Sequence, residues 1–187
     1  LNDLSTITVQ LSGGADLSET GRRASLLGPK GEVSIRYQVE GSTLKISLLE
    51  PLSKEGTDDG VYRLIITPVD SYGNEGASRE ISYTYDTQEP ELVSLSYVGD
   101  VTDLVSYNYS SESIWKLELR GRDETSGLDF QSSYLKLLGE DGKELEGVRG
   151  DDQRERMWLQ LKEPLKEDGS QDGRYKIQLS LSDKAGN

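Results

Sequence analysis

Apolar and polar residues alternate with a period of two along much of the chain. Ile7–Leu11, Met157–Leu161 and Ile177–Leu181 each carry an apolar residue at every second position. This alternation is typical of antiparallel strands with one face on a core and the other in water. Gly, Asp and Asn interrupt it at short intervals, and no stretch of ten or more residues has a convincing 3.6-residue period. The pattern predicts an all-β protein.

The alternation and its interruptions predict strands in both halves of the chain. In the first half the predicted strands are Ser5–Leu11, Ala24–Leu27, Val33–Val39, Thr43–Leu49, Val61–Val69 and Ser78–Tyr85. In the second half they are Leu92–Val98, Leu104–Tyr109, Ile114–Gly121, Ser133–Leu138, Leu145–Val148, Met157–Leu161 and Arg174–Ser182.

A repeat divides the chain into two copies. Residues 42–74 match residues 155–187 at an offset of 113, with 11 identities in 33 positions. Further upstream the matches drift to an offset of 108, which pairs Ile7 with Trp115. A fixed-offset repeat of this length indicates two domains of one type. We expect them to be residues 1–88 and 89–187, joined near Asp86–Pro90.

Each predicted domain lacks one strand that the other has. The first copy has no counterpart of Leu92–Val98, and the second has no counterpart of Ser78–Tyr85. A missing strand leaves an unpaired sheet edge, which proteins normally cover. We therefore expect the native chain to continue in both directions, with further copies of the domain.

The composition excludes several classes of function. The chain has 34 acidic and 21 basic residues, a formal net charge of −13, and neither Cys nor His. The acidic excess argues against nucleic acid as a partner, because binding phosphates needs clustered Lys and Arg. Disulfides, thiolate or imidazole metal sites and Ser–His catalysis are excluded. No apolar run is long enough for membrane insertion, and nothing in the sequence indicates an enzyme.

Three motifs carry a resemblance to a known family. They are D-G-x-Y at Asp59–Tyr62, D-x-x-G-N at Asp70–Asn74 and D-T-x-x-P at Asp86–Pro90, and the first two recur in the second copy. Their order resembles tandem bacterial immunoglobulin-like (Big-type) domains of cell-surface or secreted proteins. The resemblance implies two tandem immunoglobulin-like antiparallel β-sandwiches, 1–88 without its first strand and 89–187 without its last.

The resemblance also implies a role. Such modules mostly act as non-catalytic spacers or stalks in larger bacterial surface or secreted proteins, so we expect an extracellular or cell-surface location. The expected partners are neighbouring immunoglobulin-like domains of the same chain. Tyr62 and Tyr175 match the tyrosine corner of such sandwiches, in which the phenol bonds to upstream backbone.

Other residues are expected to fix turns and the linker. Gly-Asn pairs suit tight hairpins because both residue types tolerate positive φ, and proline limits backbone freedom. The residues concerned are Gly60, Gly173, Gly73, Asn74 and Pro90. The loop Gly13–Arg23 differs in sequence from Gly121–Ser132, so shared chemistry is not expected there.

Calcium is the one cofactor that the sequence leaves open. Asp168–Gly173 resembles the opening of a calcium loop, but its twelfth position is Leu179 instead of an acid. Acidic residues near the predicted junction offer a second candidate, because clustered carboxylates either hold a hard cation or stay apart in water. These residues are Asp58, Asp59, Asp86, Glu89, Asp123, Glu124 and Asp183.

Trp158 is the candidate binding residue. By strand parity it faces away from the core, whereas Trp115 faces in, and its counterpart in the first copy is Lys45. An exposed Trp can stack on a sugar ring or on another protein, or pack against a neighbouring domain. The alternative function is therefore a binding module for carbohydrate or a host protein, accessory to an enzyme or adhesin.

Overall fold

A computed structural model describes residues 4–11, 15–97, 100–102 and 113–187. Every strand pairing among them is antiparallel, and the helix they contain has six residues. The predicted all-β class is confirmed. The chain separates into two compact units, unit 1 from Leu1 to Gln88 and unit 2 from Glu89 to Asn187. The predicted strand Leu104–Tyr109 lies outside the described residues.

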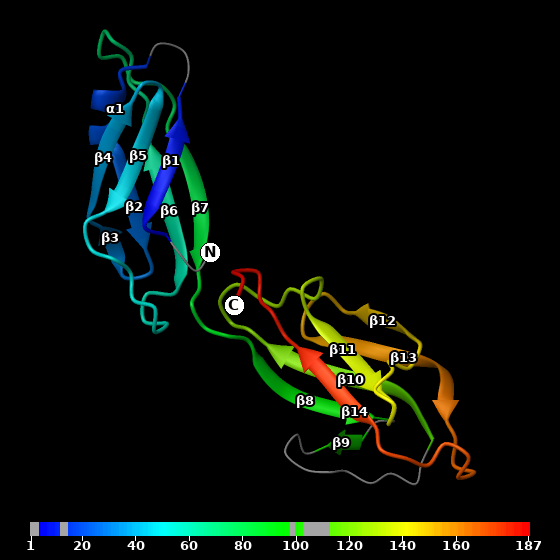
Figure 1. Ribbon diagram of the computed structural model, residues 1–187. Helices are drawn as coiled ribbons and strands as arrows, with labels where there is room; N and C mark the ends of the chain where they lie inside the picture. The colour runs from blue at the N-terminus through cyan, green and yellow to red at the C-terminus, as the bar shows by residue number, and fades with distance from the viewer. Residues whose placement is uncertain (1–3, 12–14, 98–99, 103–112) are drawn as a thin grey trace. The chain divides into compact units, whose positions relative to one another are not determined.

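Unit 1 contains two sheets (Figure 1). The first has the order β1-β5-β4, formed by β1 (Thr6–Gln10), β5 (Thr43–Leu48) and β4 (Ile35–Glu40). The second has the order β3-β2-β6-β7, formed by β3 (Gly31–Val33), β2 (Ala24–Gly28), β6 (Gly60–Ile66) and β7 (Arg79–Tyr85). Helix α1 (Leu17–Arg22) precedes β2.

One apolar core joins the two sheets of unit 1. Leu44 and Ile46 of β5 cluster with Leu26 of β2 and Leu64 of β6, and all four side chains are buried. These residues occupy every second position of their strands, so the alternation in the sequence becomes the division between core and surface. The buried Tyr62 and Tyr85 meet edge to face, with ring centroids 6.2 Å apart.

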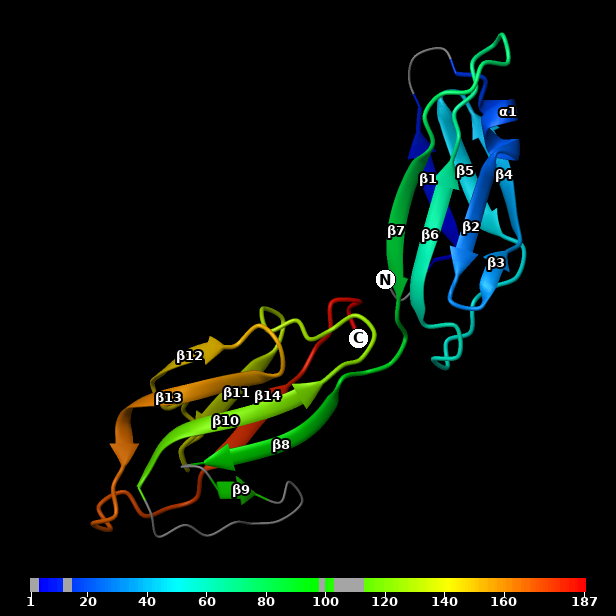
Figure 2. The ribbon, with the colours of Figure 1, turned by 180° about the vertical axis from the view of Figure 1, so that it is seen from behind.

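Unit 2 also has two sheets, seen from both sides in Figures 1 and 2. The larger has the order β12-β13-β10-β8-β9, and the smaller pairs β11 with β14. The bounds are β8 (Glu91–Tyr97), β9 (Asp100–Thr102), β10 (Ile114–Arg122), β11 (Tyr134–Leu138), β12 (Gly147–Asp151), β13 (Arg156–Leu165) and β14 (Lys176–Ser180). The core again joins both sheets, with Leu119 and Leu159 on one side and Leu135 on the other.

Strand pairing corrects the upstream part of the repeat. Ile7 lies opposite Ile46, and Leu117 lies opposite Leu159. Because Ile46 and Leu159 are equivalent at the offset of 113, the counterpart of Ile7 is Leu117 and the offset here is 110. The pairing of Ile7 with Trp115 is therefore wrong. The sequence pattern did not reveal the error, because offsets of 108 and 110 differ by two residues and both place an apolar residue opposite Ile7 in the alignment.

The prediction that Trp115 faces the core is also wrong. Its side chain is 44% exposed. The pairing of β10 with β13 shifts register between Ile114 and Lys116, and this irregularity breaks the two-residue alternation at Trp115. Parity along a strand predicts the facing of a side chain only while the ladder is regular.

Short elements differ most from the predicted ones. The predicted strand Val33–Val39 is divided into β3 and β4, and β9 was not predicted. Helix α1 has six residues, so it has less than two turns in which a helical period could appear. Its N-cap is Asp16, whose carboxylate accepts hydrogen bonds from the backbone N–H groups of Ser18 and Glu19.

Candidate functional site

The same aspartate-centred turn follows β6 in unit 1 and β14 in unit 2. Asp70 accepts hydrogen bonds from the backbone N–H groups of Tyr72 and Asn74, at 2.9 and 2.8 Å. Asp183 accepts three backbone bonds, including one from Asn187 at 3.0 Å. The side-chain amide of Asn74, followed by the backbone N–H groups of Asn74 and Tyr72, lowers the pKa of Asp70. Both carboxylates therefore act as structural caps of their turns.

Glycine supplies the backbone geometry of this turn and asparagine supplies a donor. Gly73 and Gly186 have φ values of +84° and +96°. Gln153 is the one non-glycine residue with positive φ in the described part of the chain, so the glycine of each Gly-Asn pair, and not Asn74, has the positive φ. The Asn74 side-chain amide instead donates to Asp70 at 2.8 Å.

The two units also share a hydroxyl-centred hydrogen-bond arrangement, at the loop for which no common chemistry was expected. The Thr20 hydroxyl donates to the Asp16 carbonyl at 2.9 Å and accepts from the Val69 backbone N–H at 3.0 Å. At an offset of 113, the Ser133 hydroxyl donates to the Asp129 carbonyl at 2.7 Å. Ser133 also accepts from the backbone N–H of Ser182 at 3.0 Å, just as Thr20 does from Val69. The expectation of different loop chemistry is therefore wrong, because hydroxyl and carboxylate positions recur although the residues between them differ.

Tyr62 and Tyr175 make equivalent bonds in different surroundings. Each phenol donates to a backbone carbonyl four residues upstream at 2.7 Å, to Asp58 in unit 1 and to Gln171 in unit 2. Tyr62 is 2% exposed and Tyr175 is 36% exposed. Burial and the nearby Asp58 raise the pKa of Tyr62 to about 12, so its phenol stays a hydrogen-bond donor at neutral pH.

Two of the predicted calcium ligands are occupied within unit 1. The Asp58 carboxylate pairs with Lys30 at 2.8 Å and accepts the Ser53 backbone N–H at 2.7 Å, and both donors lower its pKa. The Asp59 carboxylate accepts the backbone N–H and the hydroxyl of Thr87. These bonds tie the corner before β6 to the segment that follows β7.

In unit 2 the structure brings two of the predicted ligands together. A carboxylate oxygen of Asp123 lies within 4.8 Å of one of Asp183. Asp123 already accepts the backbone N–H groups of Ser126 and Gly127. Two carboxylates with several N–H donors supply fewer free oxygens than the six to eight of a calcium shell. The carboxylates of Asp123 and Asp183 by themselves do not fill a calcium shell.

Asp86, Glu89 and Glu124 complete the predicted set. Asp86 accepts the Gln88 backbone N–H, and Glu89 is exposed. Glu124 is exposed and lies 3.8 Å from Arg122. Pro90 is half-buried and precedes β8. Calcium binding by these acids stays a prediction.

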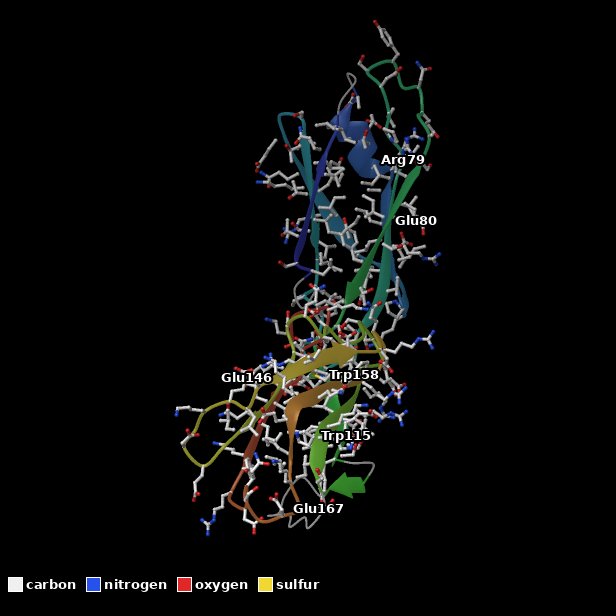
Figure 3. All side chains as sticks on the ribbon, turned by 90° about the vertical axis from the view of Figure 1, so that its right-hand side faces the viewer. Arg79, Glu80, Trp115, Glu146, Trp158 and Glu167 are labelled. Atoms are coloured by element: carbon white, nitrogen blue, oxygen red, sulfur yellow. The ribbon has the colours of Figure 1, made fainter. Side chains whose placement is uncertain are left out.

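Trp158 lies on the outer face of the five-stranded sheet of unit 2 (Figure 3). Its neighbours along β13 face the core, and Gly150 and Glu118 lie opposite it on the flanking strands. A Cβ atom at Gly150 would lie 2.7 Å from the indole, so the missing side chain leaves room for the ring. The Lys116 ammonium lies 5.2 Å from the ring centroid, a cation–π contact. The ring is half-buried among polar groups.

A shallow cavity of about 370 Å³ in unit 2 was not predicted. Its lining includes Glu140, Asp172 and Tyr175. In unit 1, Pro29 packs 2.5 Å from where a Cβ of Gly60 would stand, whereas the nearest atom to a Cβ of its counterpart Gly173 belongs to Glu140, 3.9 Å away. The sequence could have indicated this cavity only through an alignment of the two copies that pairs Pro29 with Glu140.

No protein family model matches this sequence, and no curated protein is significantly similar to it. Among the described residues, no helix combines the length and apolarity needed to cross a membrane.

Proposed function

We propose that the chain is a non-catalytic spacer segment built from two tandem immunoglobulin-like β-sandwiches of a larger bacterial cell-surface or secreted protein. In this role each unit separates and positions other domains. The motifs of the repeat support the assignment, since D-G-x-Y and D-x-x-G-N stand at the corner and the hairpin on either side of the same strand in both units.

The observation that carries the proposal is where the two units agree. They share the tyrosine bond to upstream backbone, the aspartate-capped turn and the buried hydroxyl bridge. They differ at outward positions such as Trp158, whose counterpart is Lys45. Features that hold a fold together are repeated, while surface chemistry is not, as expected of a module whose function is to keep its shape.

Stretching a single chain from its two ends tests the spacer role. We expect two separate unfolding events, each releasing roughly 300 Å of chain at about 3.5 Å per residue. Units of similar architecture that each fold cooperatively give such steps. Smooth extension without discrete events would contradict a spacer built from two stable modules.

The second candidate function is a carbohydrate- or protein-binding module centred on Trp158. Its support is the half-buried indole on an outer sheet face, with Lys116 and Glu118 beside it. A glycan array probed with the unaltered chain, Trp158→Ala and Trp115→Ala separates the two functions. The binding function predicts signals that only Trp158→Ala abolishes, and the spacer function predicts no signal with any of the three proteins.

Calcium would add stiffness to the proposed spacer. If the predicted junction acids hold calcium, the melting temperature rises in calcium relative to chelator, because a ligand of the native state stabilises it. Asp123→Asn should remove the increase, while Glu80→Gln, an exposed acid outside both calcium candidates, should keep it. Identical melting in calcium and chelator would exclude the site.

A further inference from the structure

Strand β12 of unit 2 ends with the residues Arg149, Gly150 and Asp151 at an exposed sheet edge (Figure 2). The strand pairs with β13 along one side, and within the described residues no strand pairs with its other side. The hairpin that leads into β13 follows directly after Asp151. The side chains of Arg149 and Asp151 are both exposed, so a partner can reach them from solvent.

The equivalent strand of unit 1 has different residues at these places. By their register with the neighbouring strand, Arg149 and Asp151 correspond to Tyr37 and Val39 of β4. Tyr37 packs against the core of unit 1, and its ring lies against Gly21 of helix α1. In unit 2 both positions carry charged side chains instead. The architecture that the two units share therefore does not require an arginine or an aspartate here.

Gly150 is fixed by its neighbour on the outer face of the sheet. A Cβ atom at this position would lie 2.7 Å from the Trp158 indole. Side chains two residues apart leave an extended strand on the same side, about 6.6 Å apart along the chain. Arg149 and Asp151 therefore present a cation and an anion at a set spacing, with no side chain between them.

Both charged groups are available to a partner. Arg149 forms an ion pair with Glu144, and the two side chains are 42% and 37% exposed, so exchanging this pair for another costs little. One carboxylate oxygen of Asp151 accepts the backbone N–H of Gln153 at 2.9 Å. Among the described residues, no hydrogen bond or ion pair is recorded for its other oxygen, which can therefore ligate a cation.

We propose that Arg149, Gly150 and Asp151 form a recognition site for a cell-surface receptor that carries a divalent cation. The second oxygen of Asp151 ligates the receptor's cation, because hard divalent cations prefer carboxylate oxygens. The Arg149 guanidinium forms paired hydrogen bonds with receptor carboxylates. Cation-dependent binding of Arg-Gly-Asp is the chemistry of integrin receptors. The inference rests on the proposed extracellular location, but not on the spacer role.

Charges on an edge strand also hinder unwanted pairing with other strands. That role needs charge alone, whereas a receptor-bound cation needs the carboxylate at a set distance from the backbone. Asp151→Glu keeps the charge and moves the carboxylate outward by one methylene, so it separates the two roles. Glu146→Gln is the matched control, because it alters an exposed acid directly before β12.

The test immobilises the unaltered chain and measures binding of the purified ectodomain of the vitronectin-receptor integrin in Mn²⁺ by surface plasmon resonance. We expect saturable binding that a Gly-Arg-Gly-Asp-Ser peptide blocks. Asp151→Glu should weaken the affinity at least about tenfold, while Glu146→Gln should change it by less than about twofold. Amide NMR spectra of both variants check that unit 2 keeps its fold.

No binding by the unaltered chain would overturn the proposal. Binding that the peptide does not block, or that Asp151→Glu retains in full, would also overturn it. Peptide competition uses the unaltered chain and so decides the question even if a variant fails to fold. Two discrete unfolding events on stretching would still support the spacer role if the integrin does not bind, so the two proposals can fail separately.

Discussion

Strand β6 of unit 1 and strand β14 of unit 2 hold equivalent places, yet among the described residues β6 is paired on both sides and β14 on one. The turns next to these strands are nevertheless the same, down to the tyrosine bond and the aspartate cap. Local hydrogen bonds therefore define the turns without help from the flanking strand. Burial of the strand itself depends on that neighbour, and the contrast can be tested position by position.

The largest difference is expected in the core. Leu64→Ala should cost unit 1 about 3 kcal/mol, because it removes a fully buried side chain and leaves a cavity. Ile177→Ala should cost unit 2 about 1 kcal/mol, since its side chain is already partly in contact with water. Chemical denaturation followed by amide NMR signals of each unit measures both values. Equal losses would show that β14 is as well covered as β6.

The glycines at the start of the two strands should differ next. Gly60 has a φ of +141° and lies against Pro29, so Gly60→Ala should destabilise unit 1 by about 2 kcal/mol. Gly173 is not among the positive-φ glycines, and the nearest atom to an added Cβ is 3.9 Å away. Gly173→Ala should therefore change stability by less than about 0.5 kcal/mol. Thermal unfolding of both variants checks the pair, and an equally costly Gly173→Ala would show that the two positions do not differ.

The corner tyrosines give a smaller contrast. Tyr62→Phe leaves the partly buried Asp58 carbonyl without its donor and should cost about 1–2 kcal/mol. Tyr175→Phe removes an equally short bond at a more exposed place, where water replaces the phenol, and should cost under about 0.5 kcal/mol. Denaturant titration of the two variants provides the numbers. A larger loss at Tyr175 would mean that its bond is shielded from water.

The smallest contrast concerns pH. Lys30 and the Ser53 N–H lower the pKa of Asp58, whereas its counterpart Gln171 does not titrate. A carboxyl with a lowered folded-state pKa adds stability above its unfolded pKa of about 3.9, and that stability is lost as pH falls through the folded value. Asp58→Asn should therefore flatten the acid side of the stability profile of unit 1 below about pH 4. Melting curves between pH 7 and 3 measure how the stability of unit 1 changes with pH. An unchanged pH dependence in the variant would show that Asp58 does not contribute to it.

Regular strands were predictable from sequence and irregular ones were not. Alternation places β1, β5 and β10 within a residue or two of the observed bounds, because an amphipathic strand must put one face on the core. The prediction that Trp115 faces the core was wrong because β10 has a register shift, which the pattern of residues in the sequence does not indicate. The six residues of α1 are too few to show a helical period.

The candidate sites were predictable only in part. The repeat indicated Tyr62 and Tyr175 because both follow the same Asp-Gly pair. It missed Thr20 and Ser133, since different hydroxyl residues occupy the equivalent position and an alignment by identity does not join them. The sequence also did not predict that Asp58 is bonded to Lys30 and Asp59 to Thr87. These partners come from segments far away in the sequence, so the spacing of residues along the chain does not indicate them.

Amide hydrogen exchange of the 187-residue chain tests the central claim most directly, because it compares β6 and β14 in one sample. The account predicts that β6 is protected throughout, while the β14 amides that do not bond to β11 exchange at least about 100-fold faster than those of β6. Equal protection along both strands would contradict an open edge on β14.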